Sequence, residues 1–326
     1  MSRLYSSQAW LLALAVLFAL LPLRAAQAQS CWSSAYGLSF GTVNLPSQAD
    51  TTVNVPYTCQ AGASTTYFKL CLYVNLGNQS SSANPRRMIN YGNNTYLNYM
   101  LYADAARSQI VGPPGGAYAA YTWSLTVPAG QNNQNAALYA QVPAGQSVPA
   151  GSFQEQSASG VLRYAWSTSA TPTDCAASGS QVVNIGHSGT TATVSNSCSI
   201  AIASANDLDF GSTATLASAI DQTSTISLSC PGSTTWRVGL SNGANASGNQ
   251  RRMTDGTSNY IAYELYLNSA RNQRWGNDTA GGTDTASGSG SGQANPTVLT
   301  VYGRVPVQAA QPPGSYADTI TVTLTY

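Results

Sequence analysis

The chain contains one internal repeat that spans most of its length, and this repeat limits the possible folds more than any other feature. Leu-x-Phe-Gly at residues 38–41 returns at 208–211, Arg-Arg-Met at 86–88 returns at 251–253, and the Tyr-rich run at 96–102 returns at 260–266. Further blocks recur in the same order. A period of roughly 165–170 residues is too long for a solenoid, whose units run about 20–50 residues. The repeat therefore predicts two copies of one domain.

The order of hydrophobic residues within each copy predicts β-strands. Near the chain end, polar residues separate Ile320, Val322, Leu324 and Tyr326. Such alternation turns one face of a strand toward a core and the other toward water. Gly, Pro, Asn and Ser interrupt these runs every ~8–15 residues, and helical periodicity is absent after residue 28. The pattern predicts an all-β protein of two tandem immunoglobulin-like antiparallel β-sandwich domains.

The first 28 residues have the pattern of a secretory signal peptide. Arg3 supplies a positive charge, residues 10–23 form an apolar run, and Ala26 and Ala28 make a small-x-small cleavage site. The pattern predicts removal of residues 1–28 and export of the rest of the chain. It leaves a first domain at residues 29–180 and a second at 181–326.

The expected boundary lies in a stretch rich in Ser, Thr, Ala and Pro at residues 167–180. Alternation at residues 190–199 predicts the first strand of the second domain. Between them, Val182, Val183 and Ile185 either close the first domain or belong to a linker. In the second domain, the Gly- and Ser-rich stretch 280–293 is expected to be a mobile surface loop.

Six cysteines follow the signal peptide, and an even number in an exported protein predicts disulfides. The repeat pairs them by position, because two cysteines flank the Leu-x-Phe-Gly motif in each copy. The expected bonds are Cys31–Cys59 and Cys198–Cys230, with Cys71 and Cys175 left to pair with each other. A bond from Cys175 to Cys198, between the domains, is the alternative.

The composition offers little material for catalysis. Charged residues make up 8% of the chain, and His187 is its single histidine. No Cys-x-x-Cys pair or Gly-x-Ser-x-Gly elbow is present, so we expect no enzymatic activity, cofactor or metal. His187, between two small residues, is expected in an exposed loop. Thirteen Lys and Arg are balanced by twelve Asp and Glu, which argues against nucleic-acid binding.

The repeated polar residues admit a structural or a functional role. Glu155 and Asp318 occupy matching positions after Gly-Ser-Phe-Gln and Gly-Ser-Tyr-Ala, which favours a structural role in a turn. The pairs Asp207 with Asp209 and Asp278 with Asp284 lie on predicted turns and are not expected to be catalytic. The Arg-Arg-Met motif could contact a nucleic acid or an acidic ligand. Its recurrence at one position in both copies favours a scaffold role in which arginine donates to loop carbonyls.

Together these motifs resemble the spore coat protein U domain. The match lies in the segments Cys198 to Cys230 around Leu-Asp-Phe-Gly, Arg252-Met253, Tyr-Glu-Leu-Tyr at 263–266, Trp275-Gly276, and residues 301–306 and 314–326. It is close over residues 190–326 and looser over 29–166, where the Trp-Gly pair is missing. The resemblance implies a subunit of archaic chaperone–usher pili, and two-domain members are similar to tip subunits. It further implies a sandwich that lacks its final strand.

The resemblance also implies partners and a location. In such pili a periplasmic chaperone fills the missing strand, an outer-membrane usher assembles the subunits, and an adjacent pilin then donates the strand. The chain is accordingly expected to pass through the periplasm to the surface of a Gram-negative bacterium. Ile320, Val322, Leu324 and Tyr326 are expected to form one wall of the acceptor groove. After cleavage only Gln29 and Ser30 would precede Cys31, so no strand is left to donate, which favours the fibre tip.

The leading hypothesis is therefore a tip adhesin whose first domain attaches to an abiotic or host surface and promotes biofilm formation. Ile110, Val111, Tyr118 and Tyr121 lie in an uncharged loop and are candidates for surface binding, unless they pack against neighbouring strands. A stand-alone secreted coat or matrix protein without strand exchange is the main alternative. A polysaccharide-active enzyme is a third possibility, which the scarcity of acids and histidine opposes.

Overall fold

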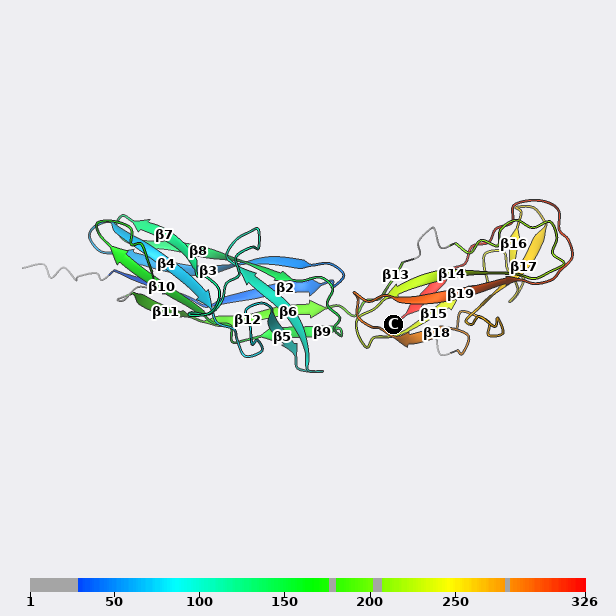
Figure 1. The fold of residues 1–326 in the computed structure, drawn as a ribbon, viewed down its shortest axis with the longest axis horizontal. Helices are drawn as coiled ribbons and strands as arrows, with labels where there is room; N and C mark the ends of the chain where they lie inside the picture. Colours follow the sequence, from blue (N-terminus) through cyan, green and yellow to red (C-terminus); the bar gives the residue numbers. More distant parts are fainter. Residues whose placement is uncertain (1–28, 176–179, 202–206, 279–281) are drawn as a thin grey trace, which may run out of the picture.

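A computed structural model describes residues 29–175, 180–201, 207–278 and 282–326, and all regular secondary structure within these ranges is strand. The strands form two sandwiches arranged end to end (Figure 1). The all-β prediction is confirmed, whereas the predicted signal peptide lies outside the described residues. No helix in the described ranges is long and apolar enough to cross a membrane.

In the described residues the first sandwich contains twelve strands: β1 (Ser30–Ser33), β2 (Tyr36–Val43), β3 (Ala49–Ala61), β4 (Thr66–Val74), β5 (Arg86–Asn90), β6 (Thr95–Tyr102), β7 (Tyr121–Val127), β8 (Gly130–Val142), β9 (Gly151–Glu155), β10 (Gly160–Ser167), β11 (Gln181–Ile185) and β12 (His187–Val194). They form an eight-stranded sheet, β1-β3-β8-β6-β5-β9-β12-β2, and a four-stranded sheet, β11-β10-β4-β7. Alternation builds the core between them: in β3, Val53, Val55 and Tyr57 are buried, whereas Asn54 is exposed and Pro56 is half-buried.

The part of the second sandwich that the structure describes contains eight strands: β13 (Ser199–Ala201), β14 (Ile220–Ser229), β15 (Thr235–Leu240), β16 (Arg251–Thr254), β17 (Tyr260–Tyr266), β18 (Ala286–Ser289), β19 (Thr297–Val305) and β20 (Val322–Thr325). Its sheets, β13-β14-β19-β17-β16 and β18-β15-β20, have the same strand order as β1-β3-β8-β6-β5 and β7-β4-β10 of the first. The repeat in the sequence is thus a repeat of fold. The first sandwich has four strands with no counterpart among the described strands of the second: β2, β9, β11 and β12.

The disulfides follow the prediction from the repeat. Cys31, on the edge strand β1, is bonded to Cys59 near the end of β3. Cys198, just before the edge strand β13, is bonded to Cys230 just after β14. Cys71 on β4 is bonded to Cys175, so the alternative bond between domains is wrong. Bonds that close loops of about 30 residues stabilise a domain by roughly 3.5 kcal/mol in the chain-entropy model.

Strand pairing moves the boundary between the two units. β11 pairs with β10, and β12 pairs with both β2 and β9, so both strands complete the first sandwich. Val182, Val183 and Ile185 therefore close the first domain, as one of the two alternatives predicted, and do not form a linker. By strand pairing, the boundary expected at residue 180 is wrong. The prediction that residues 190–199 form the first strand of the second domain is also wrong, because β12 belongs to a sheet of the first sandwich. Sequence alternation marked this strand but could not show which sheet it joins.

The Gly-rich stretch at 280–293 also differs from expectation. Its described part contains β18, and Gln293 at its end is only 5% exposed. Gln293 accepts a hydrogen bond from the backbone N–H of Leu45 in the first sandwich through Oε1 (3.2 Å) and donates one to the carbonyl of Ser197 through Nε2 (3.3 Å). The stretch therefore helps to join the two sandwiches rather than forming a free loop.

Candidate functional site

The first sandwich is closed by a segment that runs through both of its sheets. β11 adds to the outer edge of β10 in antiparallel register, with Val183 opposite Leu162. The chain then crosses to the other sheet, where β12 lies parallel to β2 and antiparallel to β9. We name residues 181–194 the closing segment.

Alternate side chains of β12 fill the space between β2 and β9. Thr190, Ala192 and Val194 are at most 2% exposed, whereas Thr191 and Thr193 face solvent. The inward side chains are small because this space lies against the large side chain of Phe153, directly opposite Ala192 in β9. The closing segment therefore contributes core side chains as well as backbone hydrogen bonds.

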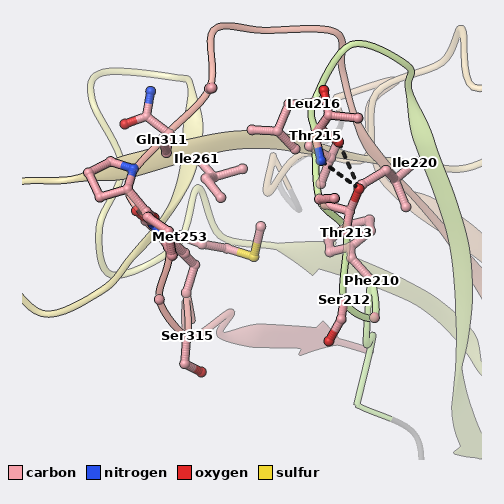
Figure 2. A pocket seen from close by; sticks show the side chains of 18 of the residues that line it. Phe210, Ser212, Thr213, Thr215, Leu216, Ile220, Met253, Ile261, Gln311 and Ser315 are labelled. Carbon is pink, nitrogen blue, oxygen red and sulfur yellow. Dashed lines mark hydrogen bonds between the residues drawn. The ribbon is translucent and has the colours of Figure 1, made fainter.

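The second sandwich has an open groove at the equivalent place. Residues 208–213 correspond to β2 and residues 314–318 to β9, and no described strand lies between them. The groove has a volume of about 690 Å³. Its apolar lining includes Leu208, Phe210, Leu216, Met253, Ile261 and Tyr316. Figure 2 shows the segment that carries Phe210 to Ile220 facing the one that carries Gln311 and Ser315, with Met253 and Ile261 between them.

Comparison of the two copies shows what the groove leaves uncovered. Leu38, Met88 and Leu97 of the first sandwich are at most 3% exposed beneath their closed sheet. Their equivalents Leu208, Met253 and Ile261 are only partly buried. Because the repeat keeps the same residue types at these positions, the difference in exposure comes from the missing strand rather than from a more polar groove.

The edge of β20 is open as well. β10, its counterpart, has β11 on its outer side, and the inward Leu162 and Tyr164 are buried. β20 pairs only with β15 among the described strands, and Val322 and Leu324 are half-buried. An unpaired edge of this kind is a template for a further strand.

Of the four residues expected in an acceptor wall, three lie beside the second core: Ile320, Val322 and Leu324. Tyr326 follows the end of β20 and is 53% exposed. The lining from residues 208–216 and 310–316 was not predicted individually. A signal for it existed, since both segments align by the repeat with the two strands that hold β12.

The Arg-Arg-Met motif has the expected scaffold role. Arg86 is fully buried and donates to the carbonyls of Val74 (2.8 Å), Asn75 (2.5 Å) and Val111 (3.0 Å). Arg251 does the same for Leu240 (2.8 Å), Ser241 (2.7 Å) and Trp275 (2.7 Å), and it also pairs with Glu264. Burial lowers the pKa of both guanidinium groups from their usual value. In each copy the buried arginine fixes the loops behind β5 or β16.

The matched acids Glu155 and Asp318 are turn anchors. Glu155 is 1% exposed and accepts from the backbone N–H groups of Gln79 (3.0 Å) and Ser157 (2.7 Å). Asp318 accepts from the backbone N–H of Asn245 (3.1 Å) and from the hydroxyl of Tyr263 (2.7 Å). These bonds confirm the structural role predicted from their position.

The prediction of an exposed loop for His187 is wrong. His187 begins β12, is partly buried, and lies with its ring centroid 5.0 Å from that of Tyr36. Its Nε2 atom is 3.0 Å from the hydroxyl of Thr190. Burial lowers the pKa of this histidine below its usual value. Gly186 and Gly189 interrupt the alternation of apolar and polar residues, so the sequence does not predict that the strand extends to His187.

The predicted surface loop is only partly at the surface. Val111 is 1% exposed, donates its N–H to the carbonyl of Leu101 and belongs to the first core, so its assignment to a binding surface is wrong. Ile110, Tyr118 and Tyr121 are half-buried. Tyr121 packs against Trp123, with ring centroids 5.0 Å apart. Among the described residues, no group of three His, Cys, Asp or Glu side chains could hold a metal ion.

Comparison with known proteins agrees with this architecture. A family model described as Spore Coat Protein U domain matches twice, at residues 17–157 and 185–323. The fold is similar to that in a structure titled as the CsuC–CsuE chaperone–tip adhesion subunit pre-assembly complex from archaic chaperone–usher Csu pili of Acinetobacter baumannii. That match has a TM-score of 0.53 and 21% identity, covering 91% of this chain and 100% of the other.

A weaker likeness is to the CupB6 tip adhesin from Pseudomonas aeruginosa. Its TM-score is 0.33 and its identity 13%, with 91% of this chain and 94% of that one covered. No curated protein sequence matches the chain.

Proposed function

The chain belongs to the Spore Coat Protein U domain family, and from this premise we propose that it is a pilus subunit whose second sandwich is completed by a strand from another protein. One observation carries the proposal. The same fold occurs twice, and residues 181–194 close it in the first copy, whereas a groove with apolar side chains in its lining lies open at the equivalent place in the second.

For physical reasons, the open groove of the second sandwich needs a partner. A groove of about 690 Å³ beside the unpaired edge of β20 exposes apolar side chains and free backbone groups, both of which favour aggregation. An added strand supplies backbone hydrogen bonds and side chains at alternate positions. We propose that a periplasmic chaperone provides this strand first, and that an adjacent pilin replaces it when an outer-membrane usher assembles the fibre.

We place the chain at the pilus tip, exposed on the cell surface, with the first sandwich as the adhesive domain. The first sandwich is already closed within the chain and needs no partner strand. The fold shared with a chaperone–tip adhesion subunit complex supports this position. The proposed role is attachment, and no enzymatic role is proposed.

Expression with and without the cognate chaperone tests the proposal. We expect the chain to aggregate or be degraded alone and to form a soluble one-to-one complex when the chaperone is present. Removal of residues 319–326, which deletes β20, should abolish capture because the edge that receives the strand is lost. A chain that is soluble and monomeric without a chaperone would instead favour the stand-alone coat or matrix protein.

Adhesion needs a separate test that leaves the core intact. Ile110 and Tyr118 are half-buried, so serine at both should weaken attachment to apolar or carbohydrate surfaces while pili still assemble. Val111 and Tyr121 are left unchanged, because Val111 belongs to the core and Tyr121 packs against it. Unaltered attachment to every surface tested, with normal pilus number, would reject this loop as the adhesive surface.

A further inference from the structure

We propose that the closing segment, residues 181–194, is the second copy's own N-terminal donor strand, used within the chain to complete the first copy. It follows that this segment is a template for the strand that the open groove accepts. The inference rests on the proposed function, because it names the chemistry of the partner at the same groove.

The equivalence of the two copies carries the first step. Cys31 on β1 bonds to Cys59 of β3, and Cys198, next to β13, bonds to Cys230 after β14. Cys198 is therefore the second copy's equivalent of Cys31, and whatever precedes Cys198 is N-terminal to the second copy. The family match agrees, since its second part begins at residue 185 and so includes β12.

The second step is the place where this extension lies. Although it belongs to the second copy by sequence, β12 pairs with β2 and β9, and β11 pairs with β10, all of the first copy. An N-terminal extension of one domain thus completes the sheets of the domain before it. The chain behaves as two strand-exchanged subunits that have become one polypeptide.

The third step compares the two acceptor sites. Leu38, Met88, Leu97 and Phe153 around β12 correspond to Leu208, Met253, Ile261 and Tyr316 in the open groove. The backbone turn is also shared, because Gly41 and Gly211 both adopt positive φ, 63° and 74°. A site of the same shape and chemistry should accept the same type of strand.

The partner strand can then be specified. Its first part should pair antiparallel with β20, as β11 does with β10. Its second part should run between residues 208–213 and 314–318 with small or β-branched side chains at three alternate inward positions, as in Thr190, Ala192 and Val194. Only residues 195–197 separate β12 from Cys198, so the partner's own cysteine-bearing strand should follow closely.

A self-completed variant tests this inference. Tyr326 occupies the position of Tyr164 in the first copy, so a copy of residues 165–194, with Cys175→Ser in the copy, is added after Tyr326. The second sandwich then has the same covalent connection from β20 as the first has from β10. We expect the extended chain to be soluble without a chaperone and no longer captured by it. Amide hydrogens of β16 and β17, which border the groove, should exchange at least tenfold more slowly than in the natural chain.

The matched control carries the same extension with Thr190→Asp, Ala192→Asp and Val194→Asp in the copy only. It should behave like the natural chain, because charged side chains cannot occupy the apolar groove. If the extended chain still needs the chaperone and still binds it, the template inference is overturned while the proposed function stands. If the natural chain itself is soluble and ignores the chaperone, the proposed function fails first.

Discussion

Single residues repeated in both copies show how this scaffold supports loops with few charges. Arg86 and Arg251 are fully buried, and each donates to three backbone carbonyls, two at the end of a strand and one in a separate loop. A guanidinium group suits this role because its donors lie in a fixed plane and it keeps its charge. The neighbouring Arg87 lies instead over the ring of Tyr96, 5.0 Å from its centroid, on the outer face.

Arg86→Ala should lower the free energy of unfolding of the first sandwich by about 3 kcal/mol, because it leaves buried carbonyls without donors. Arg87→Ala is the matched control and should cost less than about 1 kcal/mol, since it removes only a surface contact. Denaturant unfolding followed by tryptophan fluorescence measures both. Equal effects of the two substitutions would contradict the assigned role of the buried arginine.

His187 should make the stability of the first sandwich depend on pH. Burial lowers its pKa below 6.5 in the folded chain, and Tyr36, Glu155 and Arg86 are the other titratable groups near it. The unfolded chain then binds the proton more tightly, so stability is present above about pH 6.5 and is lost as the pH falls. Thermal unfolding between pH 7.5 and 5 should show a falling midpoint.

His187→Gln removes the titration and keeps a group able to bond to Thr190. Because the chain has one histidine, this variant isolates the effect. Its unfolding midpoint should change less over the same pH range. An identical pH profile for both proteins would show that His187 does not control it.

At the scale of elements, the closing segment, which supplies β11 and β12, separates the closed first copy from the open second copy. β12 has neighbours on both sides, and its inward side chains are almost completely buried. The counterparts of β2 and β9 in the second copy form no described strands, and only an isolated bridge from Ala317 to Thr254 retains the link to β16. Without a strand at the place of β12, the counterpart of β9 loses one of its two neighbours and the counterpart of β2 loses the neighbour with which β2 pairs, which explains why these segments are irregular.

Substitutions on the two faces of β12 should separate its roles. Ala192→Asp places a carboxylate in the first core and should lower stability by about 3 kcal/mol or more. Thr191→Asp, on the exposed face of the same strand, should change it by about 0.5 kcal/mol at most. Limited proteolysis near residue 180 together with denaturant unfolding tests this. Similar behaviour of the two variants would refute closure by inward side chains.

At the scale of the whole molecule, the two sandwiches are joined by neutral hydrogen bonds. The N–H of Gly232 donates to the carbonyl of Val148 (3.1 Å), and Asn295 donates through Nδ2 to the hydroxyl of Ser147 (2.5 Å). Gln293 bonds to both Leu45 and Ser197. Contacts at several points, together with the short connection after β12, hold the sandwiches in line (Figure 1).

Gln293→Ala should loosen this joint without unfolding either sandwich. Small-angle scattering should show a broader distribution of distances and a shorter mean length, because the buried amide no longer links the first sandwich to the second. Gln273→Ala is the control, since its side chain is exposed away from the joint. Unchanged scattering for Gln293→Ala would mean that the remaining contacts set the alignment.

Around residues 307–308, the second sandwich repeats the surface with which the first sandwich forms this joint. Gln308 donates its N–H to the carbonyl of Leu216 (3.2 Å), as Gly145 does to that of Leu45 (2.9 Å). Val307 there is 63% exposed, at the position of Ala144, which borders the joint. Under the proposed function a neighbouring subunit covers Val307. Val307→Lys should then reduce incorporation into pili and leave chaperone capture intact, whereas normal incorporation would argue against docking at this surface.

The sequence by itself determined the repeat, the all-β fold and the three disulfides. These features depend on periodicity and on equivalent positions, which are local or shared between copies. It also marked alternating residues at 190–194 and an uncharged loop at 110–121. The scaffold role of the buried arginines followed from their recurrence.

Only the tertiary structure decided which sheet each strand joins. Alternation shows that Thr190, Ala192 and Val194 share a face, but their partners, β2 and β9, come from distant parts of the chain. For the same reason burial of Val111 and of His187 could not be predicted, since the covering residues are remote in sequence. The groove in the second sandwich depends on a strand that the described residues do not supply, so only comparison of the two folded copies reveals it.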